Sequence, residues 1–401
     1  MAKPKIRFNG YTEDWEQRKF GEIVEKYEDP VETPTEGYTR LGIRSHAKGT
    51  FHSYVEKGKE LETAKMFRVA ADKFIVNITF GWEHAVAITD ENDAGKLVSH
   101  RFPQYSFNAG MEPKFFRYLI LDENFKHHLE LSSPGGAGRN RVLKLSDMLQ
   151  YKMNFPSEAE QKKIAAYFDD LDHLITLHQR KCEQTKTLKK YMLQKMFPQD
   201  GEKVPQIRFE GFTEDWEQRK LSEIALQTYG GGTPKTANEE FWKGNIPWIQ
   251  SSDLIEERLF NVKPRKYISQ EAISKSSTKL VPQNSIAIVT RVGVGKLAFM
   301  PFSYATSQDF LSLSELKIEP KFAVYALYKM MRLVSNEVQG TSIKGITKDE
   351  LLAKEILIPD CEEQKKIGAY LHNLDHLITL HQRKCDELKE VKKFMLQNMF
   401  V

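Results

Sequence analysis

The 401-residue chain is poor in cysteine and contains no long apolar run. Its three cysteines are too few for a disulfide framework, which favours a reducing compartment such as the cytoplasm. No segment approaches the roughly 20 consecutive apolar residues that span a bilayer, and the N-terminal segment lacks the apolar core of a signal peptide. We therefore expect a cytoplasmic protein that has no membrane partner.

Common catalytic signatures are missing as well. The chain has no N-P-P-[YF] motif of the adenine methyltransferases and no Walker loop. The nearest match, VGVGK at Val292–Lys296, lacks the full glycine spacing and the following Ser or Thr. The net charge of +4 permits a nucleic-acid partner without requiring one.

The chain does contain an internal duplication. Residues 6–23 and 207–224 are identical at fourteen of eighteen positions, and Glu160–Cys182 matches Glu363–Cys385 at nineteen of twenty-three. Within the second pair, the twelve-residue segment LDHLITLHQRKC occurs twice without change. One repeat of about 200 residues indicates a tandem duplication rather than a solenoid.

Each repeat places a variable block between the shared segments. β-Branched and aromatic runs predict short strands, an apolar run rich in Ala and Met predicts a helix, and Gly-rich runs predict loops. We interpret each block as a compact α+β domain. The predicted strands are 74–80, 84–89, 115–121, 285–292 and 297–300, the predicted helix is 322–332, and the predicted turns or loops are 133–141, 230–235 and 339–345.

The shared segments near the end of each repeat predict long helices. Ser157 with Glu160, and Asp360 with Glu363, have the spacing of a capping box, in which the acidic side chain reaches back to the N-cap. Beyond each box, apolar residues recur in alternating steps of four and three, which is the seam of a coiled coil. The seam residues are Ile164, Phe168, Leu171, Ile175, His178, Cys182 and Thr185 in the first helix, and Ile367, Leu371, Leu374, Ile378, His381, Cys385 and Leu388 in the second.

These elements predict the fold class and the domain boundaries. A helix of about 40 residues is roughly 60 Å long, and with one apolar stripe it needs a partner, which the second copy supplies. We expect an α+β protein in which two globular domains are separated by two long antiparallel coiled-coil helices, related by a pseudo-two-fold internal duplication. The boundaries are 1–154 for the first domain, 155–197 for the central spacer helix, 198–206 for a linker, 207–357 for the second domain and 358–401 for the C-terminal spacer helix.

Several of these motifs resemble those of a known family, the specificity subunits of type I restriction–modification systems. They are the W-E-x-x-K segments at Trp15–Lys19 and Trp216–Lys220, the GGTP turn, WIQSSDL at Trp248–Leu254, and the repeated LD-x-LI-x-LHQRK helix. The resemblance covers essentially the whole chain in the family's order. The first half departs from it, because GGTP is absent and FPSEAEQ stands where the second half has IPDCEEQ.

The resemblance implies a non-catalytic subunit that recognises double-stranded DNA. Each variable block would be a target-recognition domain for one half of a split, asymmetric sequence. The helices would space the two halves and bind methyltransferase subunits, which carry S-adenosylmethionine, and restriction subunits would complete the enzyme. The chain itself would need no cofactor. Two rivals remain open, a bivalent protein adaptor without a DNA role and a free-standing DNA-binding regulator.

Polar and basic side chains in the predicted loops are the candidates for DNA contacts, because phosphates attract Lys and Arg and base edges need hydrogen-bonding groups. Any one of them could equally be a solvated surface residue. The candidates are Arg44, Lys48, Trp82, His84, His100, Arg101, Arg139 and Arg141 in the first domain, and Lys235, Gln250, Ser251, Arg291, Lys296, Gln308 and Lys344 in the second.

Two other clusters have a functional and a structural interpretation. His178, Cys182, His381 and Cys385 could bind zinc if the helices are antiparallel, but small and semi-polar seam residues explain the pattern without a metal, and we predict none. The basic run Lys186, Lys189, Lys190 and Lys195 could follow DNA, whereas such runs are more often a solvated helix face or a partner surface.

Overall fold

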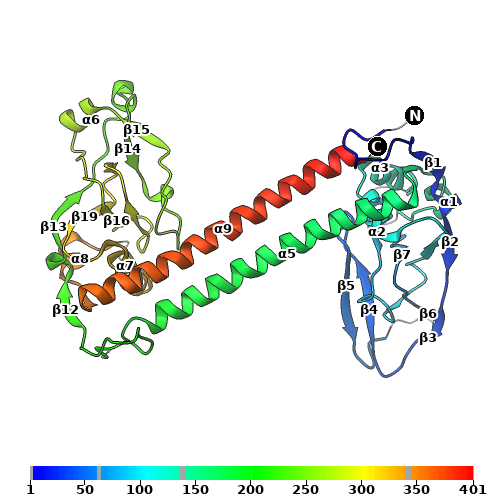
Figure 1. Cartoon of the computed structure of the whole chain (residues 1–401), viewed down its shortest axis with the longest axis horizontal. Helices are drawn as coiled ribbons and strands as arrows, with labels where there is room; N and C mark the ends of the chain where they lie inside the picture. The colour runs from blue at the N-terminus through cyan, green and yellow to red at the C-terminus, as the bar shows by residue number, and fades with distance from the viewer. Residues whose placement is uncertain (1–2, 61–64, 136–140, 200, 340–344, 401) are drawn as a thin grey trace. The chain divides into compact units, whose positions relative to one another are not determined.

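The computed structural model describes residues 3–60, 65–135, 141–199, 201–339 and 345–400 (Figure 1). The chain divides into two compact units. Unit 1 is Met1–Leu177 with Lys384–Val401, and unit 2 is His178–Arg383. Each unit therefore contains one variable block and a segment of each long helix, which differs from the predicted division into separate domains and helices. None of the described helices is both long and apolar enough to cross a membrane.

Unit 1 is built on two sheets and a small strand pair. The antiparallel sheet has the order β2 (Val24–Tyr27), β10 (Gln104–Phe107), β7 (Lys73–Val76), β8 (Val86–Ile88). The second sheet has the order β3 (Pro30–Glu32), β6 (Lys65–Arg68), β9 (Leu97–Val98), β4 (Tyr38–Ile43), β5 (Thr50–Val55). β1 (Glu16–Lys19) pairs with β11 (Lys152–Phe155), and the short helices are α1 (Phe20–Ile23), η1 (Gly81–Glu83), α2 (Pro113–Leu119), α3 (Glu123–Leu131) and α4 (Leu145–Met148).

Unit 2 repeats this plan with a different sequence. Its antiparallel sheet has the order β13 (Ala225–Gly230), β19 (Phe310–Leu316), β16 (Ser285–Val289), β17 (Leu297–Met300). A three-stranded sheet has the order β15 (Lys266–Ile268), β14 (Ile246–Ile249), β18 (Ala305–Thr306). β12 (Glu217–Lys220) pairs with β20 (Glu355–Ile358), and the helices are η2 (Leu221–Glu223), η3 (Glu239–Trp242), η4 (Ser251–Asp253), α6 (Gln270–Lys275), α7 (Pro320–Gln339) and α8 (Lys348–Ala353).

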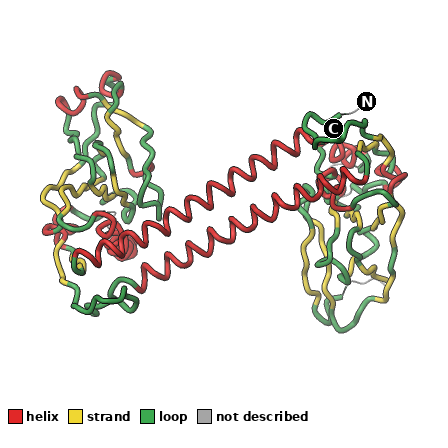
Figure 2. The backbone as a smooth tube through the Cα atoms, in the orientation of Figure 1, coloured by secondary structure: helices red, strands yellow, loops and turns green. Residues whose placement is uncertain are grey.

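The two units share one strand topology. The sheet β2-β10-β7-β8 corresponds, strand for strand in chain order, to β13-β19-β16-β17. The parallel pair β4–β9 corresponds to β14–β18, and the antiparallel pair β4–β5 corresponds to β14–β15. Strands β3 and β6 are additions of unit 1. The variable blocks are thus two versions of one α+β fold, as Figure 2 shows from the mixture of strands and short helices in each unit.

The long helices are α5 (Glu158–Lys195) and α9 (Cys361–Met399), and their segments run antiparallel within each unit. In unit 1 the Lys392 amine contacts the Asp172 carboxylate at 2.6 Å, and the Phe400 ring lies 5.8 Å from Phe168. In unit 2 the Lys189 amine contacts the Asp375 carboxylate at 2.6 Å. The predicted long helices and their antiparallel direction are confirmed, with ends two to three residues inside the predicted bounds.

One predicted strand is wrong. Residues 115–119 belong to α2 rather than a strand, and 120–121 lie in the turn after it, although the aromatic and branched side chains of this run favour extended backbone. Pro113 occupies the first turn, where its missing N–H costs nothing, and the Glu112 carboxylate accepts a hydrogen bond from the Lys114 N–H at 3.4 Å. The run then buries Phe115, Phe116 and Leu119 on one helical face.

The strand predicted at 297–300 forms as β17 with the same bounds, whereas the strands predicted at 74–80, 84–89 and 285–292 occur but end earlier or begin later than predicted. β7 ends at Val76 because the Asn77 side chain accepts a hydrogen bond from the Thr79 N–H at 3.1 Å, which closes a turn. β8 begins at Val86 because His84 has a positive φ of 60°. β16 ends at Val289, so that Arg291 and Val292 lie in the following loop. The predicted loop residues 136–140 and 340–344 lie outside the described residues.

The predicted capping boxes are also corrected. Asp360 does accept hydrogen bonds from the N–H groups of Glu362 and Glu363, at 2.8 and 3.1 Å. The Glu363 carboxylate, however, receives two hydrogen bonds from the Arg208 guanidinium, at 2.7 and 2.8 Å. In the first repeat, Arg7 binds Glu160 in the same bidentate way, at 2.7 Å for both bonds.

Candidate nucleic-acid interface

In unit 2, the loops that follow four strands meet at one edge of the sheets. The Gly232 N–H, after β13, donates to the Thr306 carbonyl at 2.8 Å, and the Ser307 N–H, after β18, donates to the Ile249 carbonyl of β14 at 2.9 Å. A Cβ atom at Gly231 would lie 1.8 Å from the Ser307 carbonyl oxygen, so this close approach requires glycine. The predicted GGTP turn therefore positions the loop against its neighbours.

The loop between β16 and β17 joins the same edge. A Cβ atom at Gly293 would lie 4.0 Å from Ser251 and 3.8 Å from the Lys296 side chain. The Ile346 N–H donates to the Thr290 carbonyl at 2.8 Å, which brings in the segment that precedes α8. Residues 230–235, 250–253, 290–296, 306–309 and 345–346 together form what we call the unit 2 loop cluster.

Most of the second domain's candidates lie in this cluster. Lys235, Arg291 and Gln308 are exposed, and Gln250, Ser251 and Lys296 are half-buried. The Thr233 hydroxyl donates to the Gln308 side-chain oxygen at 2.9 Å, which holds Gln308 beside the GGTP turn. Lys344 falls outside the described residues.

Unit 1 has an equivalent cluster after the corresponding strands. The His46 N–H, after β4, donates to the Glu83 carbonyl at 2.9 Å, and the Ile78 N–H, after β7, donates to the Arg101 carbonyl, after β9, at 3.0 Å. The Leu143 N–H donates to the Ile78 carbonyl at 2.9 Å. Residues 44–49, 77–84, 99–103 and 141–143 form the unit 1 loop cluster.

The first domain's candidates divide into accessible and inaccessible residues. Arg44, Lys48, His100 and Arg101 are exposed. Arg141 and Trp82 are half-buried, and the Arg141 guanidinium lies over the Trp82 ring at 5.7 Å, which presents its charge at a fixed place. Arg139 lies outside the described residues.

His84 is removed from the candidate set because its side chain is buried. It is 3% exposed, and its Nε2 atom lies 2.8 Å from the Ile120 carbonyl oxygen. Burial lowers the pKa of this imidazole, so that the neutral form is favoured. Its role is to hold the turn after η1 against the end of α2.

The helix residues that the sequence singled out pack as seams in both units. Ile164, Phe168, Leu171 and Ile175 are buried in unit 1, and Ile367, Leu371 and Leu374 are buried in unit 2, where Ile378 is half-buried. The Nδ1 atoms of His178 and His381 lie 3.0 Å apart in unit 2. The described residues contain no group of three or more His, Cys, Asp or Glu side chains that could hold a metal ion.

The predicted basic run on α5 divides in a similar way. Lys189 is 7% exposed, and besides Asp375 its amine lies 5.6 Å from the Tyr325 ring, so it serves the packing of unit 2 rather than DNA. Tyr325 donates to the same Asp375 carboxylate at 2.6 Å. Burial and this carboxylate raise the pKa of the Tyr325 phenol. Lys186 pairs with Glu183 on the helix surface at 2.7 Å.

Sequence reasoning missed Arg7 and Arg208. Both belong to the shared I-R-F segment, and each binds a glutamate of the following long helix that is 0% exposed. The signal was present, because the arginine and the glutamate recur together in both repeats. These arginines touch no loop of either cluster among the described contacts; they fix the orientation of each domain on its helix.

Exposed apolar side chains recur at equivalent positions of α5 and α9. In unit 1 they are Leu174, Val391 and Phe394, and in unit 2 they are Leu377, Leu188 and Tyr191, with exposed fractions between 40% and 55%. Viewed from the N-terminus of its own helix, each of these residues lies on the same side of the seam. Because the two helix segments of a unit are antiparallel, residues on that side of both helices share one face of the helix pair. We call these sets the unit 1 and unit 2 apolar stripes.

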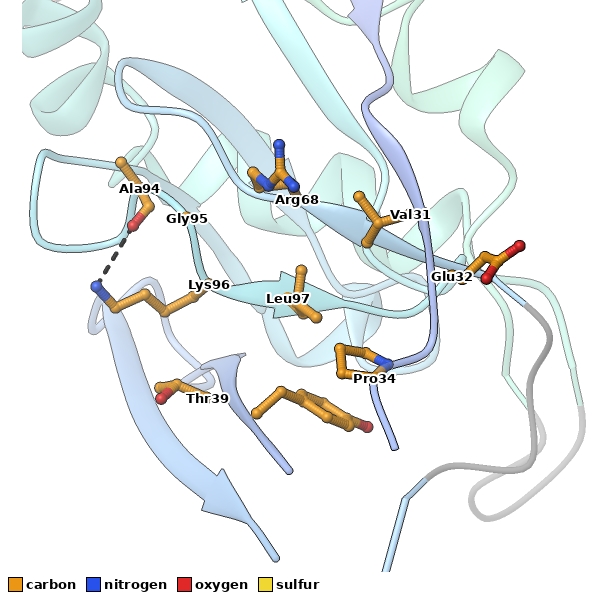
Figure 3. A pocket seen from close by; sticks show the side chains of 10 residues that line it. Val31, Glu32, Pro34, Thr39, Arg68, Ala94, Gly95, Lys96 and Leu97 are labelled. Atoms are coloured by element: carbon orange, nitrogen blue, oxygen red, sulfur yellow. Dashed lines mark hydrogen bonds between the residues drawn. The ribbon is translucent and has the colours of Figure 1, made fainter. Parts of the chain in front are cut away.

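A concave surface elsewhere in unit 1 is unrelated to the loops. It has a volume of about 540 Å³, and its lining includes the polar side chains of Arg68, Lys96, Glu32 and Thr39 together with apolar residues (Figure 3). The Lys96 amine donates to the Ala94 carbonyl at 3.4 Å, as the dashed line in Figure 3 marks. Part of its lining comes from the first residues of β4 and β9, whereas the loop cluster follows the opposite ends of these strands.

Comparison with known proteins decides the family. A family model described as "Type I restriction modification DNA specificity domain" matches residues 12–187 and 213–390. The chain belongs to this family. The matches cover both variable blocks, including both loop clusters, so the predicted resemblance and the α+β duplication are confirmed. The chain is a DNA-recognition component of a restriction–modification system and not a catalytic one.

Individual relatives extend over different parts of the chain. This chain is 23% identical to a putative type I restriction enzyme MjaX specificity subunit of Methanocaldococcus jannaschii. The alignment of 406 residues covers 97% of this chain and 93% of the relative. It is 29% identical to the MjaIX specificity subunit of the same organism over 47% of this chain and 44% of that one. It is 33% identical to the EcoR124I/EcoR124II specificity subunit of Escherichia coli, over 40% of this chain and 41% of that one.

Two solved structures are similar in fold. The type I restriction–modification S subunit from M. genitalium matches 100% of this chain and 99% of that one with a TM-score of 0.61, at 13% identity. The HsdS subunit from Thermoanaerobacter tengcongensis matches 96% of each chain with a TM-score of 0.50, at 19% identity.

Proposed function

We propose that each unit reads one half of a split, asymmetric sequence in double-stranded DNA through its loop cluster. The observation that carries the proposal is that equivalent strands deliver equivalent loops, while the side chains on those loops differ between the units. Unit 1 presents Arg44, Arg101 and Arg141 there, and unit 2 presents Gln250, Arg291 and Gln308. Different donors and acceptors at the same place would select different bases.

The apolar stripes support a role in assembly. An exposed row of large apolar side chains on a helix pair indicates a surface that a partner covers. The two stripes are equivalent, so we propose that they bind two copies of a methyltransferase subunit, and that restriction subunits join the same complex. We further propose that S-adenosylmethionine belongs to the methyltransferase subunit, that this chain carries no cofactor, and that the complex works in the cytoplasm, where its DNA is.

Co-expression with the methyltransferase of the same system, followed by genome-wide mapping of adenine methylation, tests the proposal. The expected result is one asymmetric motif made of two specified segments around an unspecified spacer. If methylation depends on the presence of this chain but the methylated sites share no split motif, the proposal that the two units recognise two half-sites is contradicted. No methylation, together with stable binding of two proteins by the chain, would instead support the adaptor; site-specific DNA binding without any partner would support the free-standing regulator.

A further inference from the structure

A basic and aromatic cavity adjoins the unit 2 loop cluster. Its volume is about 610 Å³, and its lining includes Thr236, Trp242, Lys243, Arg265, Lys266 and Tyr267. Three of these side chains are cationic, two are aromatic, and no carboxylate lines the cavity. The family motifs contain none of these six residues.

Tight packing of the surrounding backbone and rings fixes the shape of the cavity. A Cβ atom at Gly244 would lie 2.1 Å from the Ile268 carbonyl oxygen, so the segment before β14 approaches β15 as only glycine allows. The Trp242 and Trp248 rings meet edge to face at 5.0 Å. The Lys266 amine lies 5.6 Å from both ring centres, which fixes its charge beside the cavity.

The charges in the cavity are not equivalent. Lys243 pairs with Glu240 at 2.8 Å, and Arg265 lies 3.5 Å from the buried Asp253 carboxylate. Lys266 forms no ion pair with a carboxylate of the described residues. Lys266 is therefore the cation that is most available to an anionic ligand.

Contacts connect the cavity to the DNA loops on two sides. The Trp242 indole N–H donates to the Lys235 carbonyl at 3.4 Å, and the Trp248 indole N–H donates to the Gly232 carbonyl at 3.0 Å. Lys266 is the strand partner of Trp248, which is two residues from Gln250 of the cluster. A duplex that lies on the loop cluster would thus reach the cavity with its flanking backbone.

We propose that this cavity binds the sugar-phosphate backbone of DNA next to the second half-site, with the phosphate at Lys266 and the sugar against Tyr267. The inference rests on the function proposed above. The lining supplies cations, which contact phosphates, and aromatic surface against which a sugar can pack. Phosphate and sugar are the same at every base pair, so the contact is independent of sequence and contributes affinity and register.

The test uses the full chain in complex with its methyltransferase and a duplex that carries the mapped split site. Lys266→Gln keeps a long polar side chain and removes the charge. We expect severalfold weaker binding, a salt slope that is smaller by about one, and an unchanged methylated motif. Hydroxyl-radical protection should decrease only in the backbone that flanks the second half-site. Unchanged salt slope and protection, or a changed motif, would overturn the proposal.

Lys317→Gln is the matched control. Lys317 is exposed and follows β19, whose other end, at Phe310, borders the loop cluster, so this lysine lies at the opposite edge of the sheet. Its replacement should change neither the salt slope nor the protection; an equal effect of both variants would also count against the cavity, because it would indicate a general charge effect. If the unchanged complex shows no preference for a split site, the proposed function fails, which is a different result from loss of the flanking contact alone.

Discussion

At the scale of single residues, we expect a large loss of stability when a buried glutamate at the start of a long helix loses its arginine partner. Glu160 is 0% exposed, and Arg7 supplies both hydrogen bonds to its carboxylate. Arg7→Ala leaves that charge buried and unpaired, which should lower the free energy of unfolding by about 3–5 kcal/mol. Urea unfolding measures the change.

Two comparison variants separate this loss from a general effect of charge. Lys162 pairs with Glu158 on the surface at 2.6 Å, so Lys162→Ala should cost less than about 1 kcal/mol. Replacing Arg7 and Glu160 together with apolar residues should recover most of the stability, since no buried charge then remains. Equal costs for Arg7→Ala and Lys162→Ala would contradict the importance of burial.

The histidines predict a loss of stability in weak acid. Burial lowers the pKa of His84, His372 and His381 below the ordinary 6.5, and His178 lowers that of His381 further. As pH falls below about 6.5, the unfolded chain takes up protons that the folded chain resists, so the free energy of unfolding decreases until the lowered folded pKa values are passed. His381→Asn should reduce this decrease.

Unfolding measured from about pH 7.5 to about pH 5.5 checks this prediction. A steeper decrease in His381→Asn than in the unchanged chain would show that the His178–His381 contact does not resist protonation.

At the scale of elements, Arg141 and Trp82 allow a test of the unit 1 loop cluster. Arg141→Ala should weaken binding to a duplex that carries the first half-site, whereas binding to the second half-site alone should not change. Lys26→Ala is the control, because Lys26 lies in β2 and pairs with Glu28 at 2.5 Å, outside the cluster. Equal affinity of the Arg141 variant and the unchanged complex would remove Arg141 from the candidates.

The apolar stripes predict the stoichiometry of the complex. Val391→Asp with Phe394→Asp places two charges on the unit 1 stripe, and burying them against a partner is costly. We expect this variant to retain one methyltransferase subunit instead of two, as measured by the mass of the complex in solution. Lys389→Asp, which alters an exposed residue on the other side of the helix, should retain both. Two bound subunits in both variants would argue against the stripes.

The sequence predicted elements well where the pattern alone decides them. The long helices, the strand at 297–300, the first five residues of the strand predicted at 285–292 and the duplication follow from periodicity and repetition. Residues 115–121 misled the prediction because composition favours a strand, while Pro113 and the Glu112 cap start a helix. The basic cavity could not be predicted, because Trp242 and Lys266 meet only through the pairing of β14 and β15.

At the scale of the whole molecule, the account rests on independence of the two reading domains. The strand order, the loop clusters, the arginine–glutamate pairs and the apolar stripes all occur once in each unit. Residues 6–154 and 207–357 therefore occupy corresponding places in the repeat and should be exchangeable. The boundaries predicted from the sequence supply the junctions for such an exchange.

The most direct measurement replaces residues 207–357 with a second copy of residues 6–154 and maps methylation in cells that carry the methyltransferase. Two identical domains on antiparallel helices should read identical half-sites in opposite orientation, so the account predicts a symmetric motif made of the first half-site and its inverted repeat. A variant that folds and methylates the original asymmetric motif would contradict it.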